Sequence, residues 1–559
     1  MSAVHSRTAL RANEDVFVAH AAANKVFPMT GKIEHMRYAW SLYLLLLALK
    51  IFLASRLPII NDEAYYIQWG DHTSWSYYDH PPLVGWIANL INQFVSGDGH
   101  VTLRLLAYRS VPIIGMFVLA WLVSRAATQD RRKRHLVALL YLYLPESFAS
   151  IIFSTDFFAL FFSTCGGLLW WKSIETRRLG MAFAAGLTFS IGFLAKETQC
   201  FALVGIGLWW LLHLGSRFAW KNFFVVQVGF WPLVTYWFWE IVHHCGGPML
   251  LHFGRVDWQS RVKWLDPLQF FIQDLLQEAA LIGPWTIWAL AMYWRRLKTQ
   301  SEGSLTKEFA RPEKASALGW LIAGNWVCFA VLALKQAISL HWGVLFHPFV
   351  IVLAGDWLSR IQLLRLLHIQ FKVAAGLCLF LGIVVCAPLN WFRVLGDGYK
   401  YAVFMKEQSL ICPTFAAYKQ QNPTLHFASP NYGHGASVQF TCSQPFSVIN
   451  SRTQYGRSDD LWTDWRDLHG SDILVFSVDK IQEQDYAPFF SKVTLRLLPS
   501  SDPAVSYYLI YGERFRWEDY RQAELLPLKE KFYSRPLLHT EKYCPFIRNY
   551  FPVPFGRPW

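Results

Sequence analysis

The chain has 559 residues, of which 53% are hydrophobic, 17% aromatic and only 16% charged. This composition excludes an ordinary soluble enzyme and is typical of a polytopic membrane protein. The net charge of +13 does not indicate nucleic acid as a partner, because Lys and Arg gather in short loops between apolar runs, as the positive-inside rule describes.

The first 37 residues are polar and carry several Lys and Arg before any apolar run begins. A cleaved signal peptide would have its apolar core much closer to Met1. We therefore expect residues 1–37 to form a cytoplasmic N-terminal tail.

Residues 38–396 contain about eleven apolar windows, each close to the roughly twenty residues that cross a bilayer as a helix. Basic loops follow alternate windows, so these loops are expected in the cytoplasm and residues 56–103 form the first outer loop. The windows are 38–55, 104–126, 135–153, 156–173, 179–195, 197–214, 222–241, 270–294, 316–334, 341–358 and 373–391.

The outer loop begins with a concentration of carboxylates and phenols. Asp62 and Glu63 open what reads as a short interfacial helix, and Asp62 shares a helix face with Tyr66 because they are four residues apart. A sugar hydroxyl loses its proton as it attacks, and an Asp in a partly dry pocket is a suitable base. We interpret Asp62 and Glu63 as catalytic and Tyr65 and Tyr66 as substrate-binding; the alternative is a solvated loop end.

The same loop continues with the sequence YYDHPP, which combines a rigid turn with two titratable groups. The paired prolines restrict His80, whose imidazolium would neutralise charge on a phosphodiester. We expect His80 to bind the phosphate group of a sugar-phosphate donor and Tyr78 to bind substrate. Asp79 is a candidate metal ligand. Alternatively, the prolines only end a segment and His80 is solvated.

Two later loops place ionisable residues at the outer ends of spans. Asp156 lies between aromatic residues, where a carboxylate needs a partner, and it either binds substrate or caps a helix. Lys196 falls between two spans with almost no loop, where it either binds a lipid phosphate or snorkels to the interface. Arg109 and Arg255 are further phosphate candidates.

The adjacent histidines His243 and His244 have poor spacing for binding one metal ion together. His243 and Asp79, from separate loops, are the candidate ligands of a divalent metal ion, and ordinary polar loop histidines are the alternative. No other cofactor is expected.

Residues 397–559 are expected to form a soluble α+β domain outside the membrane, because an odd number of spans precedes them. Strand-like runs at Ile473–Val478, Val493–Leu498 and Val505–Tyr511 alternate with polar turns. Cys412 and Cys442 lie in this part, where an oxidising compartment allows either a bridge or two separate thiols.

The motifs DEAYY, YYDHPPL, STDFFALFF, FLAKET and LHWGVLFHP occur in this order, and NSRTQYGRSDDLW follows in the tail. This pattern resembles bacterial members of glycosyltransferase family 39, which are protein mannosyltransferase-like and related to the lipid A aminoarabinose transferases. The resemblance covers most of the chain from residue 40 onwards. It implies a type C glycosyltransferase fold, a polyprenyl-phosphate sugar donor and inversion at the anomeric carbon.

Carried over by motif, the resemblance makes Asp62 the catalytic carboxylate with Glu63 beside it, Asp156 the second outer-loop acid and Lys196 a residue near the donor phosphate. One departure is that the aminoarabinose transferases have Glu-Lys before the two prolines, where this chain has Asp-His. Phosphate binding by His80 would therefore depend on pH.

Together these features predict a glycosyltransferase of the bacterial inner membrane. It would move a sugar from a polyprenyl-phosphate donor to an envelope acceptor, namely lipid A, a polysaccharide or a protein, at the periplasmic face. The alternative is a transporter or flippase of a lipid-linked sugar, which would favour ionisable residues and broken helices near the bilayer midplane.

Overall fold

The computed structural model describes residues 32–95, 100–243, 245, some positions between 269 and 276, 312–334, 342–450, 453, 455–533 and 543–552. Of the residues singled out in the sequence, Arg255 and His244 lie outside this part, as does most of the window 270–294. For His243 only the backbone is described.

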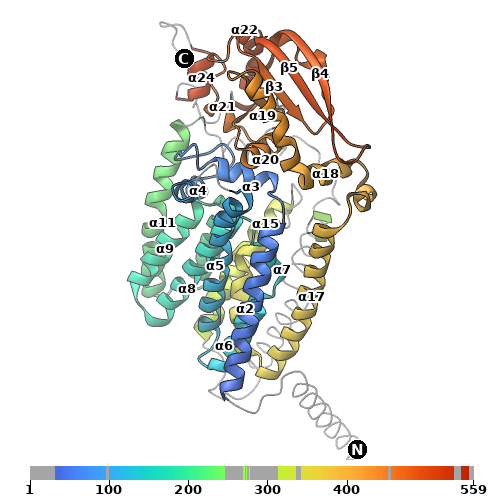
Figure 1. Ribbon diagram of the computed structural model, residues 1–559. Coiled ribbons are helices and arrows are strands. Elements are labelled where there is room, and N and C mark those ends of the chain that lie inside the picture. The colour runs from blue at the N-terminus through green and yellow to red at the C-terminus, as the bar shows by residue number, and fades with distance from the viewer. Residues whose placement is uncertain are drawn as a thin grey trace, which may run out of the picture.

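The chain is a polytopic helical membrane protein with a mixed β-sheet domain at its C-terminal end. Figure 1 shows the long helices side by side, with the sheet at one end of this bundle. The bundle helices are α2 (Lys32–Arg56), α5 (Val101–Ala127), α6 (Arg131–Leu142), α7 (Pro145–Ala149), α8 (Thr155–Thr176), α9 (Leu179–Phe193), α10 (Phe201–Leu211), α11 (Arg217–His243), α15 (Pro312–Ala333), α16 (His347–Trp357) and α17 (Arg360–Cys386).

Fewer helices qualify as single membrane spans than the sequence windows suggested. In the described part of the chain, four helices are long and apolar enough to cross a bilayer, or five if α2 and the helix after it form one bent span. The expected window 135–153 is divided between α6 and α7. Pro145 is the reason, because proline cannot continue a helix but is tolerated in the first turn of the next one.

Two short helices lie across the end of the bundle, beneath the sheet domain (Figure 1). They are α3 (Asn61–Gln68), at the position where a short helix was expected, and α4 (Leu83–Asn92). The axis of α3 turns by 87° from that of α2. This turn places Asp62 between the bundle and the C-terminal domain.

The sheet has five strands in the order β2-β1-β3-β5-β4. Strands β1 (His426–Ser429), β2 (Phe446–Val448) and β3 (Ile473–Ser477) are parallel, whereas β4 (Phe490–Pro499) and β5 (Ser506–Phe515) form an antiparallel hairpin beside β3. The three predicted strands are confirmed as β3, β4 and β5. The first two strands were not predicted, because they are only four and three residues long.

Helices cover both faces of the sheet. Alternate residues of β3 point into two separate apolar clusters: Leu474 and Phe476 join one, and Ile473 and Val475 join the other. The first cluster includes residues of α18 (Tyr399–Glu407), α19 (Cys412–Gln421) and α20 (Tyr432–Cys442). The second includes residues of α22 (Trp517–Tyr520) and α24 (Pro545–Tyr550).

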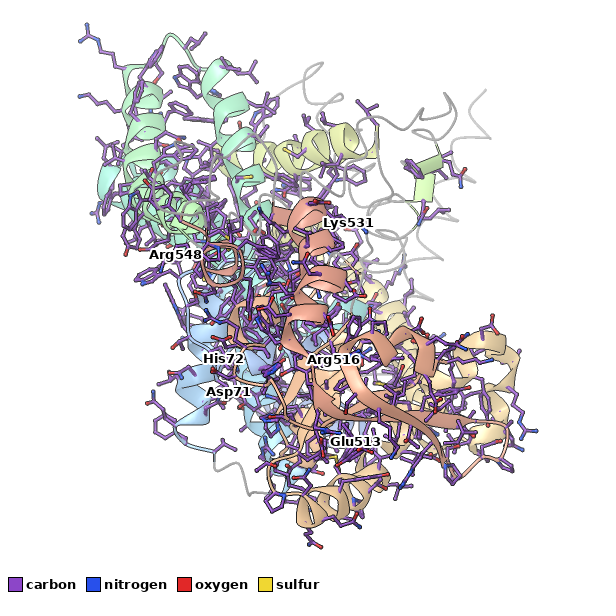
Figure 2. All side chains as sticks on the ribbon, turned by 90° about the horizontal axis from the view of Figure 1, so that it is seen from above. Asp71, His72, Glu513, Arg516, Lys531 and Arg548 are labelled. Carbon is purple, nitrogen blue, oxygen red and sulfur yellow. A yellow bond between two sulfur atoms is a disulfide. The ribbon has the colours of Figure 1, made fainter. Side chains whose placement is uncertain are left out.

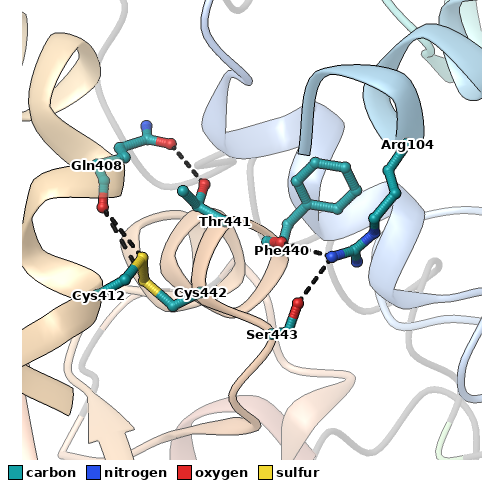
Figure 3. Close-up of a disulfide and its surroundings, with 7 residues drawn as sticks. All are labelled: Arg104, Gln408, Cys412, Phe440, Thr441, Cys442 and Ser443. Carbon is teal, nitrogen blue, oxygen red and sulfur yellow. Dashed lines mark hydrogen bonds between the residues drawn. A yellow bond between two sulfur atoms is a disulfide. The ribbon is translucent and has the colours of Figure 1, made fainter. Parts of the chain in front are cut away.

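Two disulfides tie the C-terminal domain together and to the bundle. Cys412 and Cys442 are bridged, which joins the start of α19 to the end of α20 and decides between the two alternatives left open by the sequence (Figure 3). Cys245, just after α11, is bridged to Cys544, just before α24. This second bridge was not predicted, because pairing between distant cysteines cannot be read from sequence.

Candidate active site

The first contact at the junction joins Asp62 to the C-terminal domain. Tyr432, the first residue of α20, donates a 2.9 Å hydrogen bond from its hydroxyl to Oδ1 of Asp62, which is exposed. A side chain at Gly433 would bring its Cβ within 2.5 Å of the Cβ of Asn61, so glycine permits this close packing of α20 on α3. Ser437 adds a hydrogen bond of 3.1 Å to Oδ1 of Asn61. The C-terminal domain therefore forms one wall of the Asp62 site.

An open hollow of 410 Å³ adjoins Asp62 at this wall. It lies among α18, the start of α3 and the start of α20. Its lining residues are Ile60, Asn61, Asp62, Met405, Asn431, Tyr432 and Gly433. Asn431 is the N-cap of α20 and accepts hydrogen bonds from the backbone N–H groups of Gly433 and His434 at 3.0 and 3.1 Å. These helix ends keep the hollow's polar groups in fixed positions.

Glu63 and Arg109 bind each other instead of facing the hollow. Both side chains are almost fully buried, and they form two hydrogen bonds of 2.9 and 2.6 Å. Arg109 also donates to the carbonyls of Ala54, Leu57 and Pro58, and the N–H of Phe153 donates to Glu63. The arrangement stabilises the turn between α2 and α3 and so favours a structural role for this pair over the expected catalytic and phosphate-binding roles.

Both carboxylate oxygens of Asp79 also accept hydrogen bonds from neighbouring residues. The hydroxyl of Tyr65 donates to Oδ2 at 2.7 Å, and the N–H of Gly456 donates to Oδ1 at 3.3 Å. Burial raises the pKa of Asp79, and these hydrogen bonds partly oppose the shift. No group of three His, Cys, Asp or Glu side chains suited to a metal ion is found in the part of the chain described. The contacts of Asp79 favour a role in joining the loop to the C-terminal domain over metal binding.

The tail motif that contains Gly456 packs against the outer loop. The hydroxyl oxygen of Ser458 accepts a 2.9 Å hydrogen bond from the N–H of Tyr78, and Trp462 stacks on His72 at 4.4 Å between ring centroids. Tyr78 is buried in the apolar cluster of the C-terminal domain, with its ring 6.0 Å from that of Tyr533. This burial differs from the substrate-binding position expected for Tyr78.

The same region appears from above in Figure 2. Asp71 and His72, which follow α3, lie beside the ribbon of the C-terminal domain, on which Arg516 and Glu513 are labelled. The outer loop and the tail domain are in direct contact at this end of the molecule, because His72 stacks on Trp462.

Asp156 and Lys196 form an ion pair between their Oδ1 and Nζ atoms. The Lys196 side chain is 7% exposed and the Asp156 side chain 23% exposed. Ser154 is the N-cap of α8, so Asp156 lies in the first turn, where its charge favours the helix dipole. Helix stabilisation and a place in the site are thus compatible for Asp156.

Tyr66 lies within electrostatic range of both Asp62 and Asp156, and His80 lies beside it. The His80 ring lies 6.0 Å from the Tyr66 ring, and its Nδ1 is 3.6 Å from Oε2 of Glu197, a residue that the sequence reasoning did not single out. Asp62 and Asp156 are both close enough to act electrostatically on Tyr66. The half-buried Tyr66 therefore lies among the acids and cations expected in the site.

No protein-family model matches the chain. Among curated proteins, the lipid A galacturonosyltransferase RgtD of Rhizobium johnstonii is 28% identical over 166 residues, which are 28% of this chain. The match spans only 33% of the length of that relative.

Among solved structures, ArnT from Cupriavidus metallidurans matches over 85% of this chain and 98% of its own length. The TM-score is 0.56 for the apo state and 0.57 for the state bound to undecaprenyl phosphate, at 13% and 14% sequence identity. The chain has the ArnT fold. The expected type C glycosyltransferase fold is thereby confirmed. The coverage is high although the sequence identity is low, because a fold persists where sequences diverge.

Proposed function

We propose that this protein is an inner-membrane glycosyltransferase that moves a sugar from a polyprenyl-phosphate donor to an envelope acceptor, with inversion at the anomeric carbon. The observation that carries the proposal is an exposed Asp62 beside an open hollow, with Tyr66 in electrostatic range of both Asp62 and the Asp156 of the Lys196–Asp156 pair, and with His80 beside Tyr66. The ArnT fold supports it, since ArnT from Cupriavidus metallidurans has been solved with undecaprenyl phosphate. The partial match to RgtD makes lipid A one candidate acceptor.

In this proposal Asp62 is the base and the cations bind the donor phosphate. The acceptor oxygen forms a bond to the anomeric carbon while the bond from that carbon to the phosphate oxygen breaks, and the electron pair leaves with the polyprenyl phosphate. Lys196 carries three N–H donors, so it can bind Asp156 and a phosphate oxygen together. His80 adds a second cation when it is protonated.

The proposed topology has about eleven spans within residues 38–396, a cytoplasmic tail at 1–37 and a periplasmic domain at 397–559. The bridge between Cys412 and Cys442 and that between Cys245 and Cys544 support this orientation, because disulfides persist in oxidising compartments.

One observation favours the alternative of a transporter or flippase. Glu146 and His347 form a buried ion pair, and Lys50 donates to the carbonyl and hydroxyl of Ser147, next to the break between α6 and α7. Buried ionisable residues beside a broken helix are typical of transport sites. The site around Asp62 favours transfer, because its charged residues gather at one end of the bundle.

The two functions can be separated in proteoliposomes. The purified protein is supplied with radiolabelled polyprenyl-phosphate sugar on one side and an envelope extract as acceptor. Label that becomes attached to an acceptor supports transfer, whereas label that only crosses the bilayer overturns it. Liposomes carrying Asp62→Asn are the matched control, because that variant retains the size of the side chain.

A further inference from the structure

The hollow beside Asp62 lies where the order of the parallel strands reverses. The chain leaves β1, forms α20 and returns as β2 on one side of β1, and then crosses to form β3 on the other side. Asn431 and Tyr432, which line the hollow, follow the end of β1 with only Pro430 between. A reversal of this kind leaves a crevice beyond the carboxyl ends of the strands, and ligands of open α/β sheets bind in such crevices.

The lining of the hollow suits hydroxyl groups and not phosphate. Asp62 is the one charged residue among the lining residues, and the others offer amides, a phenol and apolar carbon. The Oδ1 atoms of Asn61 and Asn431 already accept hydrogen bonds, so their Nδ2 groups remain as donors for a sugar oxygen. A phosphate placed here would meet a carboxylate, whereas a sugar ring would find both donors and acceptors.

The helix ends at the hollow do not change this charge balance. The first turn of α20 is capped by Asn431, whose Oδ1 accepts from two backbone N–H groups. The first turn of α3 already carries the carboxylates of Asp62 and Glu63, which compensate its dipole. The cations Lys196 and His80 are not among the residues that line the hollow.

We propose that the acceptor is a hydroxyl group of a saccharide, bound in this hollow, and not a phosphate group; the inference rests on the proposed function. The hydroxyl oxygen forms the new bond to the anomeric carbon, and its proton passes to the Oδ2 atom of Asp62. The bond between the anomeric carbon and the phosphate oxygen breaks, and polyprenyl phosphate leaves with the electron pair. A phosphate oxygen is already ionised near neutral pH and would not need a base.

The linkage in the product tests this inference. Proteoliposomes are given a radiolabelled polyprenyl-phosphate sugar and an envelope extract, and the labelled product is treated with mild acid and examined by phosphorus NMR. A hydroxyl acceptor gives label that resists mild acid and an unchanged number of phosphomonoesters. Release of the label by mild acid, with a phosphomonoester converted to a diester in the intact product, overturns the inference while leaving sugar transfer intact. An absence of transfer overturns the proposed function itself.

Filling the hollow tests its location separately. Met405→Trp places a larger side chain in the hollow, and Met405→Leu is the matched control of similar volume. We expect Met405→Trp to raise the KM for the acceptor extract by about tenfold or more, as pocket changes of this size do, with binding of undecaprenyl phosphate unchanged. An equal loss of undecaprenyl-phosphate binding would place the donor in the hollow and contradict the inference.

Discussion

The hydroxyl of Tyr432 donates a 2.9 Å hydrogen bond to Oδ1 of Asp62, although 370 positions separate the two residues in the chain. Burial raises the pKa of the Tyr432 phenol, and the nearby carboxylate raises it further, so the phenol keeps its proton. The proposed base is therefore oriented by a residue from the C-terminal domain. One Asp62 oxygen is held by this bond, and the other remains for the acceptor.

Tyr432→Phe should lower kcat by about tenfold or more, because it removes a hydrogen bond to a charged group worth about 1.5–3 kcal/mol. The ring and its contact with Tyr65 at 5.0 Å are retained, so the melting temperature should change little. Tyr401→Phe is the control, since the Tyr401 hydroxyl binds Asp479 elsewhere in the domain. Initial rates of sugar transfer measure the effect, and an unchanged kcat would remove Tyr432 from the site.

Glu63→Gln should destabilise the protein by about 3–5 kcal/mol, because it leaves the buried Arg109 guanidinium without its counter-charge. Thermal unfolding in detergent measures this loss. The conservative exchange Glu513→Gln, at an ion pair on the surface with Lys492, should cost about 1 kcal/mol at most. A Glu63→Gln protein of normal stability but without activity would restore the catalytic role expected from the sequence.

Lys196→Gln should weaken binding of undecaprenyl phosphate by about 10- to 100-fold, because a charge-assisted hydrogen bond contributes about 1.5–3 kcal/mol. Lys172→Gln is the matched control, since Lys172 pairs with Glu175 in the last two turns of α8, away from Asp156 in its first turn. Fluorescence titration with a labelled polyprenyl phosphate gives both dissociation constants. Equal affinity of the Lys196→Gln and wild-type proteins would mean that the phosphate binds elsewhere.

Asp459 should make the stability of the protein depend on pH. Burial raises the pKa of Asp459 to about 7, and the hydrogen bond from the N–H of Val448 only partly opposes the shift. Between the unfolded pKa of 3.8 and this value the folded state holds a proton that the unfolded state has lost, so stability falls as the pH rises through this window. The difference in melting temperature between wild type and Asp459→Asn, followed from about pH 4 to 8, isolates this group. A difference that does not vary with pH would contradict the assignment.

The sequence predicted the parts of this structure whose signals are local. A short helix at Asp62, three strands of the sheet and the placement of Lys196 between two helices follow from runs of a few residues with a clear period or boundary. The fold class followed from the order of motifs along the chain. These features do not depend on which distant segments meet.

The remaining features depend on contacts between distant segments. The sequence predicted that Glu63 is a catalytic neighbour of Asp62. In the structure Arg109, 46 positions away, binds Glu63 in the core instead. Nothing near Tyr432 or Gly433 signals that α20 packs on α3, since a small residue at a helix start also fits many other roles. In the described part of the chain, fewer helices than hydropathy windows qualify as single spans, for a related reason. Hydropathy windows do not show where Pro145 divides a helix.

The central claim is that Asp62 removes the proton of the acceptor, and the rate of sugar transfer by Asp62→Asn in proteoliposomes tests it most directly. Asp464→Asn, at a surface ion pair with Arg466, serves as the control for carboxylate loss. The account predicts a fall in kcat of about 100-fold or more, with an unchanged melting temperature and unchanged binding of undecaprenyl phosphate. Transfer by the folded Asp62→Asn protein at the wild-type rate would contradict it.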